Sequence, residues 1–84
     1  MIDQVRKLIS TKFLAGNDEF ENSDSLRNLG LTSLKFVELI ILIEDEFLIE
    51  IPDEDIDRRR FSTVDNIVGY VEGRLKQTQM GQQK

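Results

Sequence analysis

The sequence has no cysteine, no histidine and no tryptophan, and it has a single proline. The absence of cysteine excludes disulfide bonds and cysteine-based metal sites, and the absence of histidine removes the usual general base and most zinc chemistry. No apolar run approaches the ~18 residues of a membrane-spanning helix, and the first residues lack the pattern of a signal peptide. We therefore expect a cytoplasmic protein that does not insert into a membrane and holds no metal ion.

Basic residues are the minority among the charges, because 11 lysines and arginines stand against 16 aspartates and glutamates, a formal net charge of −5. This balance argues against nucleic-acid binding, which needs a basic face, and favours a basic protein partner. A chain of 84 residues has room for one domain. We expect a monomer with its domain over residues 1–76 and a disordered polar tail over residues 77–84.

Apolar residues at helical spacing predict an all-α protein with helices over residues 2–14 and 33–47 and from Ser62 onward. The last helix opens on Ser62–Asp65, which has the spacing of a capping box with aspartate in place of glutamate. A short further helix is expected after Ile51, because Pro52 is tolerated and acidic residues are favoured in a first helical turn. The fold is thus a bundle of four helices, the third of them short.

The connection between the first two predicted helices, residues 15–32, is long and rich in turn residues. A loop of this length in a small domain must pack against the core or serve a function. Its apolar side chains are the expected anchors: Phe20, Leu26, Leu29 and Leu31.

The segment 33–47 has more apolar residues than one buried helix face can hold, so either several elements surround it or part of it contacts a partner. From Phe36 through Asp57 there is no lysine or arginine, although there are nine acidic residues. Glu38 and Asp45 are seven positions apart, so they share a helix face. Apolar residues with an acidic rim are typical of a transient interface with basic enzymes.

The stretch Leu29–Leu34 indicates how this segment begins. Gly30 permits a backbone turn, and Thr32 or Ser33 can cap a helix by accepting a hydrogen bond from a free backbone N–H group. A serine at this position lies beside the positive end of the helix dipole, which favours an anion such as phosphate. On local chemistry alone, most such serines only cap the helix.

Several motifs, in the right order and spacing over residues 2–75, make the chain similar to the acyl carrier protein family: Leu29-Gly30-Leu31-Thr32-Ser33-Leu34, Val37-Glu38-Leu39, Glu44-Asp45-Glu46-Phe47, Ile51-Pro52-Asp53-Glu54 and Ser62-Thr63-Val64. This resemblance implies a four-helix bundle of the acyl-carrier type. It implies that Ser33, flanked by Thr32 and Leu34, is the attachment point of 4′-phosphopantetheine, whose thiol carries a thioester-bound cargo.

The resemblance also implies the partners. A phosphopantetheinyl transferase uses coenzyme A and Mg²⁺ to modify Ser33, and an adenylating or acyl-transferring enzyme then loads the thiol for acyl-processing enzymes. In the family, Phe36, Leu39, Ile43 and Phe47 face mainly inward. The expected partner surface consists of the residues on the other side and nearby: Leu34, Lys35, Glu38, Ile41, Asp45 and Ile51.

Three alternatives were weighed against a carrier. An enzyme is disfavoured because Ser33 has no histidine or paired lysine to activate it and no glycine-rich oxyanion loop is evident. A calcium loop starting at Asp53 fails because Arg58 stands where glycine is required and Val64 where a bidentate glutamate is required. An unmodified acidic helical adaptor would share the fold and differ only in lacking the prosthetic group.

Three departures from the family pattern favour a specialised carrier, loaded with an amino acid for example, over a fatty-acid carrier. Thr32 replaces the usual aspartate before the serine, Lys35 occupies a position that is often acidic, and the segment Asp57–Arg60 is about two residues longer. The arginines Arg58, Arg59 and Arg60 are interpreted as balancing the neighbouring acids rather than binding a phosphate.

Overall fold

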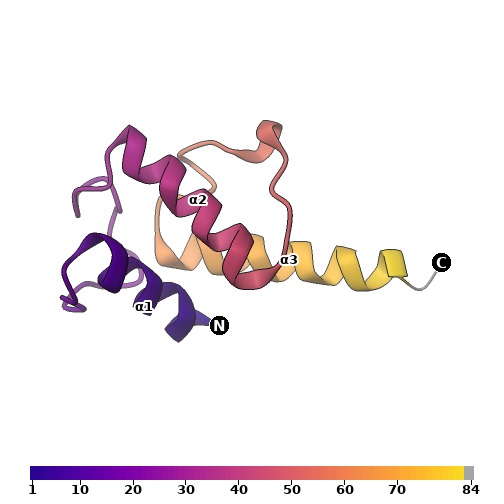
Figure 1. The fold of residues 1–84 in the computed structure, drawn as a ribbon, viewed down its shortest axis with the longest axis horizontal. Helices are drawn as coiled ribbons and strands as arrows, with labels where there is room; N and C mark the ends of the chain where they lie inside the picture. Colours follow the sequence, from indigo (N-terminus) through magenta and orange to yellow (C-terminus); the bar gives the residue numbers. More distant parts are fainter. Residues whose placement is uncertain (83–84) are drawn as a thin grey trace.

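The computed structural model describes residues 1–82, with side chains described for residues 1–76. It contains three α-helices, α1 (Ile2–Phe13), α2 (Ser33–Phe47) and α3 (Val64–Gln82), and one short 3₁₀ helix, η1 (Asp53–Asp55). No strand occurs within the described residues. Helix α1 packs against both α2 and α3, and η1 lies in the long connection between α2 and α3 (Figure 1). The all-α prediction is confirmed.

The short third helix of the predicted bundle is reduced to the single turn η1. Pro52 does not begin an α-helix but precedes η1 in an extended conformation, and Ile56 ends the turn in an extended conformation as well. Beyond it, Asp57 Oδ1 accepts a hydrogen bond from the Arg60 backbone N–H at 2.8 Å. A short polar side chain that bonds to nearby backbone competes with helix formation in this way. Four α-helices were therefore predicted, and the described residues form three.

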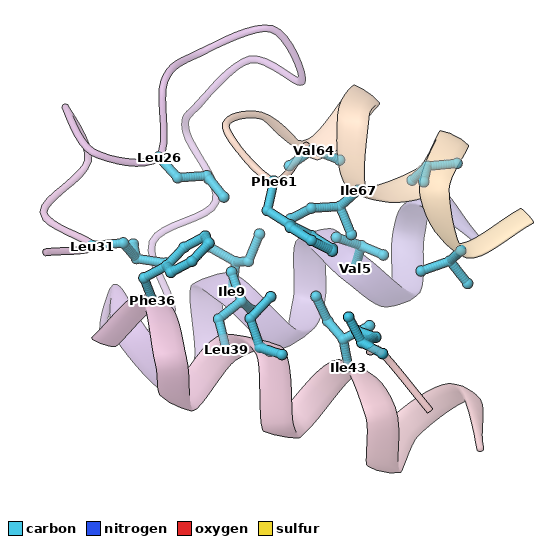
Figure 2. Close-up of a cluster of buried hydrophobic side chains, with 14 of the residues drawn as sticks. Val5, Ile9, Leu26, Leu31, Phe36, Leu39, Ile43, Phe61, Val64 and Ile67 are labelled. Atoms are coloured by element: carbon cyan, nitrogen blue, oxygen red, sulfur yellow. The ribbon is translucent and has the colours of Figure 1, made fainter. Parts of the chain in front are cut away.

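The core lies between the three α-helices, and among residues 1–76 Ser10 is the one buried residue that is not apolar. Figure 2 shows Phe61 projecting from the turn just before α3 towards side chains of α1 and α2. Its ring packs edge-on against Phe36, with centroids 6.2 Å apart, and against Tyr70 at 4.9 Å. On α2, Phe36, Leu39 and Ile43 are buried and Phe47 is partly buried, as the resemblance implied. The buried set also contains Val5, Ile9, Val64, Ile67, Val68 and Val71.

The long loop between α1 and α2 is held by buried side chains and by hydrogen bonds. Phe20, Leu26 and Leu31 are buried, as predicted, and Leu29 is partly buried. The Leu26 backbone N–H donates to the Ser62 carbonyl at 2.9 Å, which connects the loop to the start of α3. The loop therefore fixes the position of the chain immediately before α2.

Helix α3 begins one residue later than the predicted capping box implies, and it ends later than predicted. The Asn66 backbone N–H donates to Thr63 Oγ1 at 3.1 Å, so Thr63 is the capping residue rather than Ser62. A disordered tail was expected from Gln77, whereas α3 continues to Gln82. Glutamine and methionine are good helix formers, and lengthening an existing helix needs no new nucleus. Residues 83–84 lie outside the described residues, and the domain boundary at residue 76 stays a prediction.

The described helices were also compared with the length and hydropathy that a bilayer requires. Among them, no helix is both long and apolar enough to cross a membrane.

Candidate functional site

Ser33 is the first residue of α2, and its side chain is exposed. Gly30, with φ of 102°, makes the turn that leads into this helix. Thr32 follows in an extended conformation with ψ of −176°, and its carbonyl oxygen accepts the Phe36 backbone N–H at 2.8 Å. A Cβ atom at Gly30 would meet no other atom within 4 Å, so the space around this turn is open. The predicted helix start is confirmed.

The expected side-chain cap of α2 is absent. Thr32 occupies the N-cap position, but its hydroxyl makes no capping hydrogen bond. Ser33 Oγ instead accepts a hydrogen bond from Arg58 Nη2 at 3.3 Å, 25 positions along the chain. The two hydroxyls at the start of α2 are thus not used to satisfy the first turn of the helix, and both are exposed.

Arg58 is the residue near Ser33 that the sequence analysis missed. Its guanidinium carbon lies 5.3 Å from the centre of the Phe36 ring, within the range of a cation–π contact. The interpretation that all three arginines balance acidic neighbours holds for Arg60, which forms an ion pair with Asp57 at 2.6 Å. Arg58 forms no such ion pair among the described residues and instead contacts Ser33 and Phe36, a placement that no sequence pattern indicated.

A pocket of about 340 Å³ lies beside Arg58. Its apolar walls are Leu26, Leu31, Phe36 and Phe61, and its polar edge is Ser25, Arg27, Arg58, Arg59 and Ser62. Figure 2 shows the four apolar side chains converging from the loop, from α2 and from the start of α3. The pocket is therefore bounded by the same segments that position Ser33 and Arg58.

The outward face of α2 is apolar along its length. Leu34 is 72% exposed and Ile41 is 56% exposed, as the sequence analysis expected for these two residues. Val37 is also exposed and lies on the same side of the helix at 3.6 residues per turn, and Leu48, the residue that follows the end of α2, is exposed as well. We call Leu34, Val37, Ile41 and Leu48 the α2 face.

Charged residues border the α2 face. Glu38 and Asp45 are exposed and lie on the same side of the helix, and Lys35 is exposed next to Leu34. Ile51 was expected on this surface, but only 4% of its side chain is exposed and it belongs to the core. Its backbone N–H donates to Glu44 Oε2 at 2.8 Å, which turns the chain back beneath the end of α2.

The segment that carries Arg58 is attached to α3 through Tyr70, whose hydroxyl donates to Asp55 Oδ2 at 2.7 Å. Burial, together with this hydrogen bond to Asp55, raises the pKa of Tyr70 to about 12. The unfolded chain has a tyrosine pKa of about 10. Because the folded pKa is the higher one, the Tyr70 contribution to stability is intact below about pH 10 and is lost as the pH rises towards 12.

We expect the free energy of unfolding of the unmodified protein to fall more steeply between these pH values than that of the Tyr70→Phe variant. Urea unfolding at several pH values measures this difference. Both proteins contain the same lysines, so the contribution of the lysines cancels. Tyr70 is the only tyrosine, so its phenolate absorbance also gives its pKa directly. A tyrosine that titrates near pH 10 in the folded protein would contradict the prediction.

Within the described residues, no three histidine, cysteine, aspartate or glutamate side chains lie so that they could together hold a metal ion. In that part of the chain the acids of the Asp53–Asp57 run do not converge, and two of them are engaged with Tyr70 and Arg60.

Comparison with known proteins gives a match over most of the chain. A family model described as "Phosphopantetheine attachment site" matches residues 3–71. Proteins named "Acyl carrier protein" from three strains of Clostridium perfringens (SM101, ATCC 13124 and 13) are each 39% identical to this chain over 72 residues. These matches cover 84% of this chain and 92% of each relative.

Proposed function

Because the chain belongs to the acyl carrier protein family, we propose that it carries an acyl or aminoacyl cargo on a prosthetic group attached to Ser33. The prosthetic group of this family is 4′-phosphopantetheine. When bound, it supplies a terminal thiol that forms a thioester with the cargo. The observation that supports Ser33 is its exposed hydroxyl at the first residue of α2, at the end of an open turn and within reach of a cation.

The surroundings of Ser33 fit a phosphodiester. The backbone N–H groups of the first turn of α2 have no side-chain cap, and the positive end of the helix dipole lies there. Arg58 adds a full positive charge next to the hydroxyl oxygen. No acidic residue occurs in the first turn of α2, so the turn itself places no like charge against an incoming phosphate.

Attachment is a phosphoryl-type transfer in which Ser33 is the nucleophile. Ser33 Oγ attacks the coenzyme A phosphorus that is linked to pantetheine, and a new O–P bond forms. The bond from that phosphorus to the rest of coenzyme A breaks, and adenosine 3′,5′-bisphosphate leaves. The hydroxyl proton passes to a base of the transferase, because the chain has no histidine and the side chain that contacts Ser33 Oγ is a permanently charged arginine.

The experiment that tests this proposal is an intact-mass measurement of the protein before and after incubation with a phosphopantetheinyl transferase, coenzyme A and Mg²⁺. We expect a gain equal to one phosphopantetheinyl group, located on Ser33 by fragmentation. An unmodified acidic adaptor would show no gain. A gain located on another residue would remove Ser33 from the proposal while leaving the carrier role.

For the partner surface we propose the α2 face with its charged border, Lys35, Glu38 and Asp45. The apolar side chains extend along the helix that begins with Ser33, so an enzyme acting on the attached group can rest on them. Acidic side chains beside an apolar centre steer basic enzymes and add specificity. Ile51 is left out of this surface because it is buried.

Ile41→Glu tests the α2 face. An acidic side chain in the centre of the apolar strip leaves a buried unpaired charge in the complex, so we expect the kcat/KM of the transferase to fall about tenfold or more, mostly through KM. Urea unfolding should show little change, since Ile41 is exposed. The matched control is Ile2→Glu, which makes the same change at a partly exposed position of α1. An equal fall in the kcat/KM of the transferase for both variants would show that the α2 face is not the surface that the enzyme contacts.

Within the carrier class, we propose an aminoacyl or peptidyl carrier of a specialised pathway as the alternative to a fatty-acid carrier. Thr32, Lys35 and the lengthened segment before Phe61 support it, since they make the surroundings of Ser33 less negative. The protein itself catalyses nothing in this proposal; adenylating, acyl-loading and acyl-processing enzymes act on it. To distinguish an aminoacyl or peptidyl carrier from a fatty-acid carrier, the protein is incubated with a panel of acyl and aminoacyl donors and their ligases. The mass of the loaded protein then shows which donors are accepted.

A further inference from the structure

The environment of Arg58 differs from that of the two arginines that follow it. Arg60 is paired with Asp57, and Arg59 is exposed, whereas Arg58 is half-buried. Within the part of the chain that the structure describes, Arg58 has no carboxylate partner; its contacts are Ser33 Oγ at 3.3 Å and the Phe36 ring at 5.3 Å. The chain has five more acidic than basic residues, yet the Arg58 guanidinium is not paired with an acid among the described residues, so its N–H donors can still bind an anion.

We propose that Arg58 is a positioning residue that binds the phosphodiester formed on Ser33 and so holds the base of the prosthetic group against Phe36 at the edge of the pocket. This inference rests on the proposed function, because it requires a phosphate at Ser33. The contact is made by Arg58 of the lengthened Asp57–Arg60 segment with the phosphodiester on Ser33. The two residues are 25 positions apart in the chain.

Distance and charge support the assignment. The oxygen that Arg58 contacts is the one that becomes the ester oxygen, so the non-bridging phosphate oxygens will lie two bonds beyond it, through the phosphorus and near the guanidinium. Guanidinium groups present several N–H donors in a plane and match phosphate oxygens in pairs. Arg58 is less exposed than Arg59 and Lys35, and its hydrogen bond to Ser33 Oγ lies at the protein surface, where a phosphate can reach it.

Arg58 is also held in place before any phosphate arrives. On its N-terminal side, Asp55 accepts the hydrogen bond from Tyr70 and, through its carbonyl, one from the Asp57 backbone N–H. On its C-terminal side, Asp57 binds both the backbone and the side chain of Arg60. Stacking on Phe36 restricts the side chain itself. Little conformational entropy therefore remains to be lost when the phosphodiester binds.

The test compares fully modified protein with Arg58→Gln, Arg58→Lys and Lys35→Gln variants, each checked by intact mass to contain one phosphopantetheinyl group. Lys35→Gln is the matched control, because it removes one positive charge two residues from Ser33 without removing a contact to its hydroxyl. The readouts are the transverse relaxation rate of the phosphorus in ³¹P NMR and the side-chain N–H resonance of Arg58 with and without the prosthetic group.

In the protein without substitutions, we expect the Arg58 N–H resonance to shift when the prosthetic group is attached. The phosphorus of that group should then relax at the rate of the folded protein. In Arg58→Gln the relaxation rate should fall towards that of a proteolytic peptide containing modified Ser33, while Lys35→Gln retains the original rate. Arg58→Lys, which keeps the charge and loses the planar group, should lie between the two.

Two outcomes overturn the inference: a phosphorus relaxation rate in Arg58→Gln equal to that of the unmodified sequence, or an equally large fall in Lys35→Gln, which would leave net charge as the only effect. Both are distinct from failure of the proposed function, because in that case no variant gains the mass of the prosthetic group.

Discussion

Ser33→Ala is expected to abolish attachment of the prosthetic group completely. The alanine variant has no nucleophile at the first residue of α2, so incubation with transferase, coenzyme A and Mg²⁺ should leave its intact mass unchanged. The fold should remain, because the Ser33 hydroxyl is exposed and does not cap the helix; its hydrogen bond is to Arg58. We expect the free energy of unfolding to change by no more than about 0.5 kcal/mol.

Thr32→Ala is the matched control, since it removes an exposed hydroxyl one residue earlier that likewise makes no capping hydrogen bond. This variant should gain the mass of one phosphopantetheinyl group as the unmodified sequence does. The comparison separates a requirement for the hydroxyl of Ser33 from a general requirement for polar residues in the turn. Modification that persists in Ser33→Ala and disappears in Thr32→Ala would show that the attachment residue is misassigned.

Local patterns were sufficient for most of the helical structure. Apolar spacing identified α1, α2 and the start of α3, because a helix that packs on one side must repeat its buried residues every three or four positions. The division of α2 into a buried side with Leu39 and Ile43 and an exposed side with Leu34 and Ile41 required more than spacing. Spacing showed that the apolar residues were too many for one face, and only the family resemblance indicated which of them face outward.

Features that depend on contacts between distant segments were not predictable. The chain after Ile51 could form a helix by local propensity, but bonds from Tyr70 to Asp55 and from Asp57 to Arg60 hold it as a single turn followed by extended chain. The same contacts bring Arg58 to Ser33, 25 positions away. The burial of Ile51 was not predicted either, because it depends on the chain folding back under α2.

Phe61→Ala should be the most destabilising single substitution in the core. Phe61 is 1% exposed, and its ring touches both Phe36 and Tyr70. Truncating a buried phenylalanine costs about 3–5 kcal/mol, because transfer energy is lost and a cavity remains. At about 0.05–0.15 kcal/mol per residue, an 84-residue domain has a total stability of the same order. We expect a large fall in the urea midpoint at unchanged m-value, or unfolding without denaturant.

Phe13→Ala provides the matched control, because the same atoms are removed from a residue of α1 that packs only partly against the core. Its loss of stability should be clearly smaller than that of Phe61→Ala. Phe61 also forms a wall of the pocket beside Arg58, so its loss should loosen Phe36 and with it the surface on which Arg58 stacks. Equal midpoints for the two variants would show that the contacts of Phe61 with Phe36 and Tyr70 do not stabilise the junction between α2 and α3.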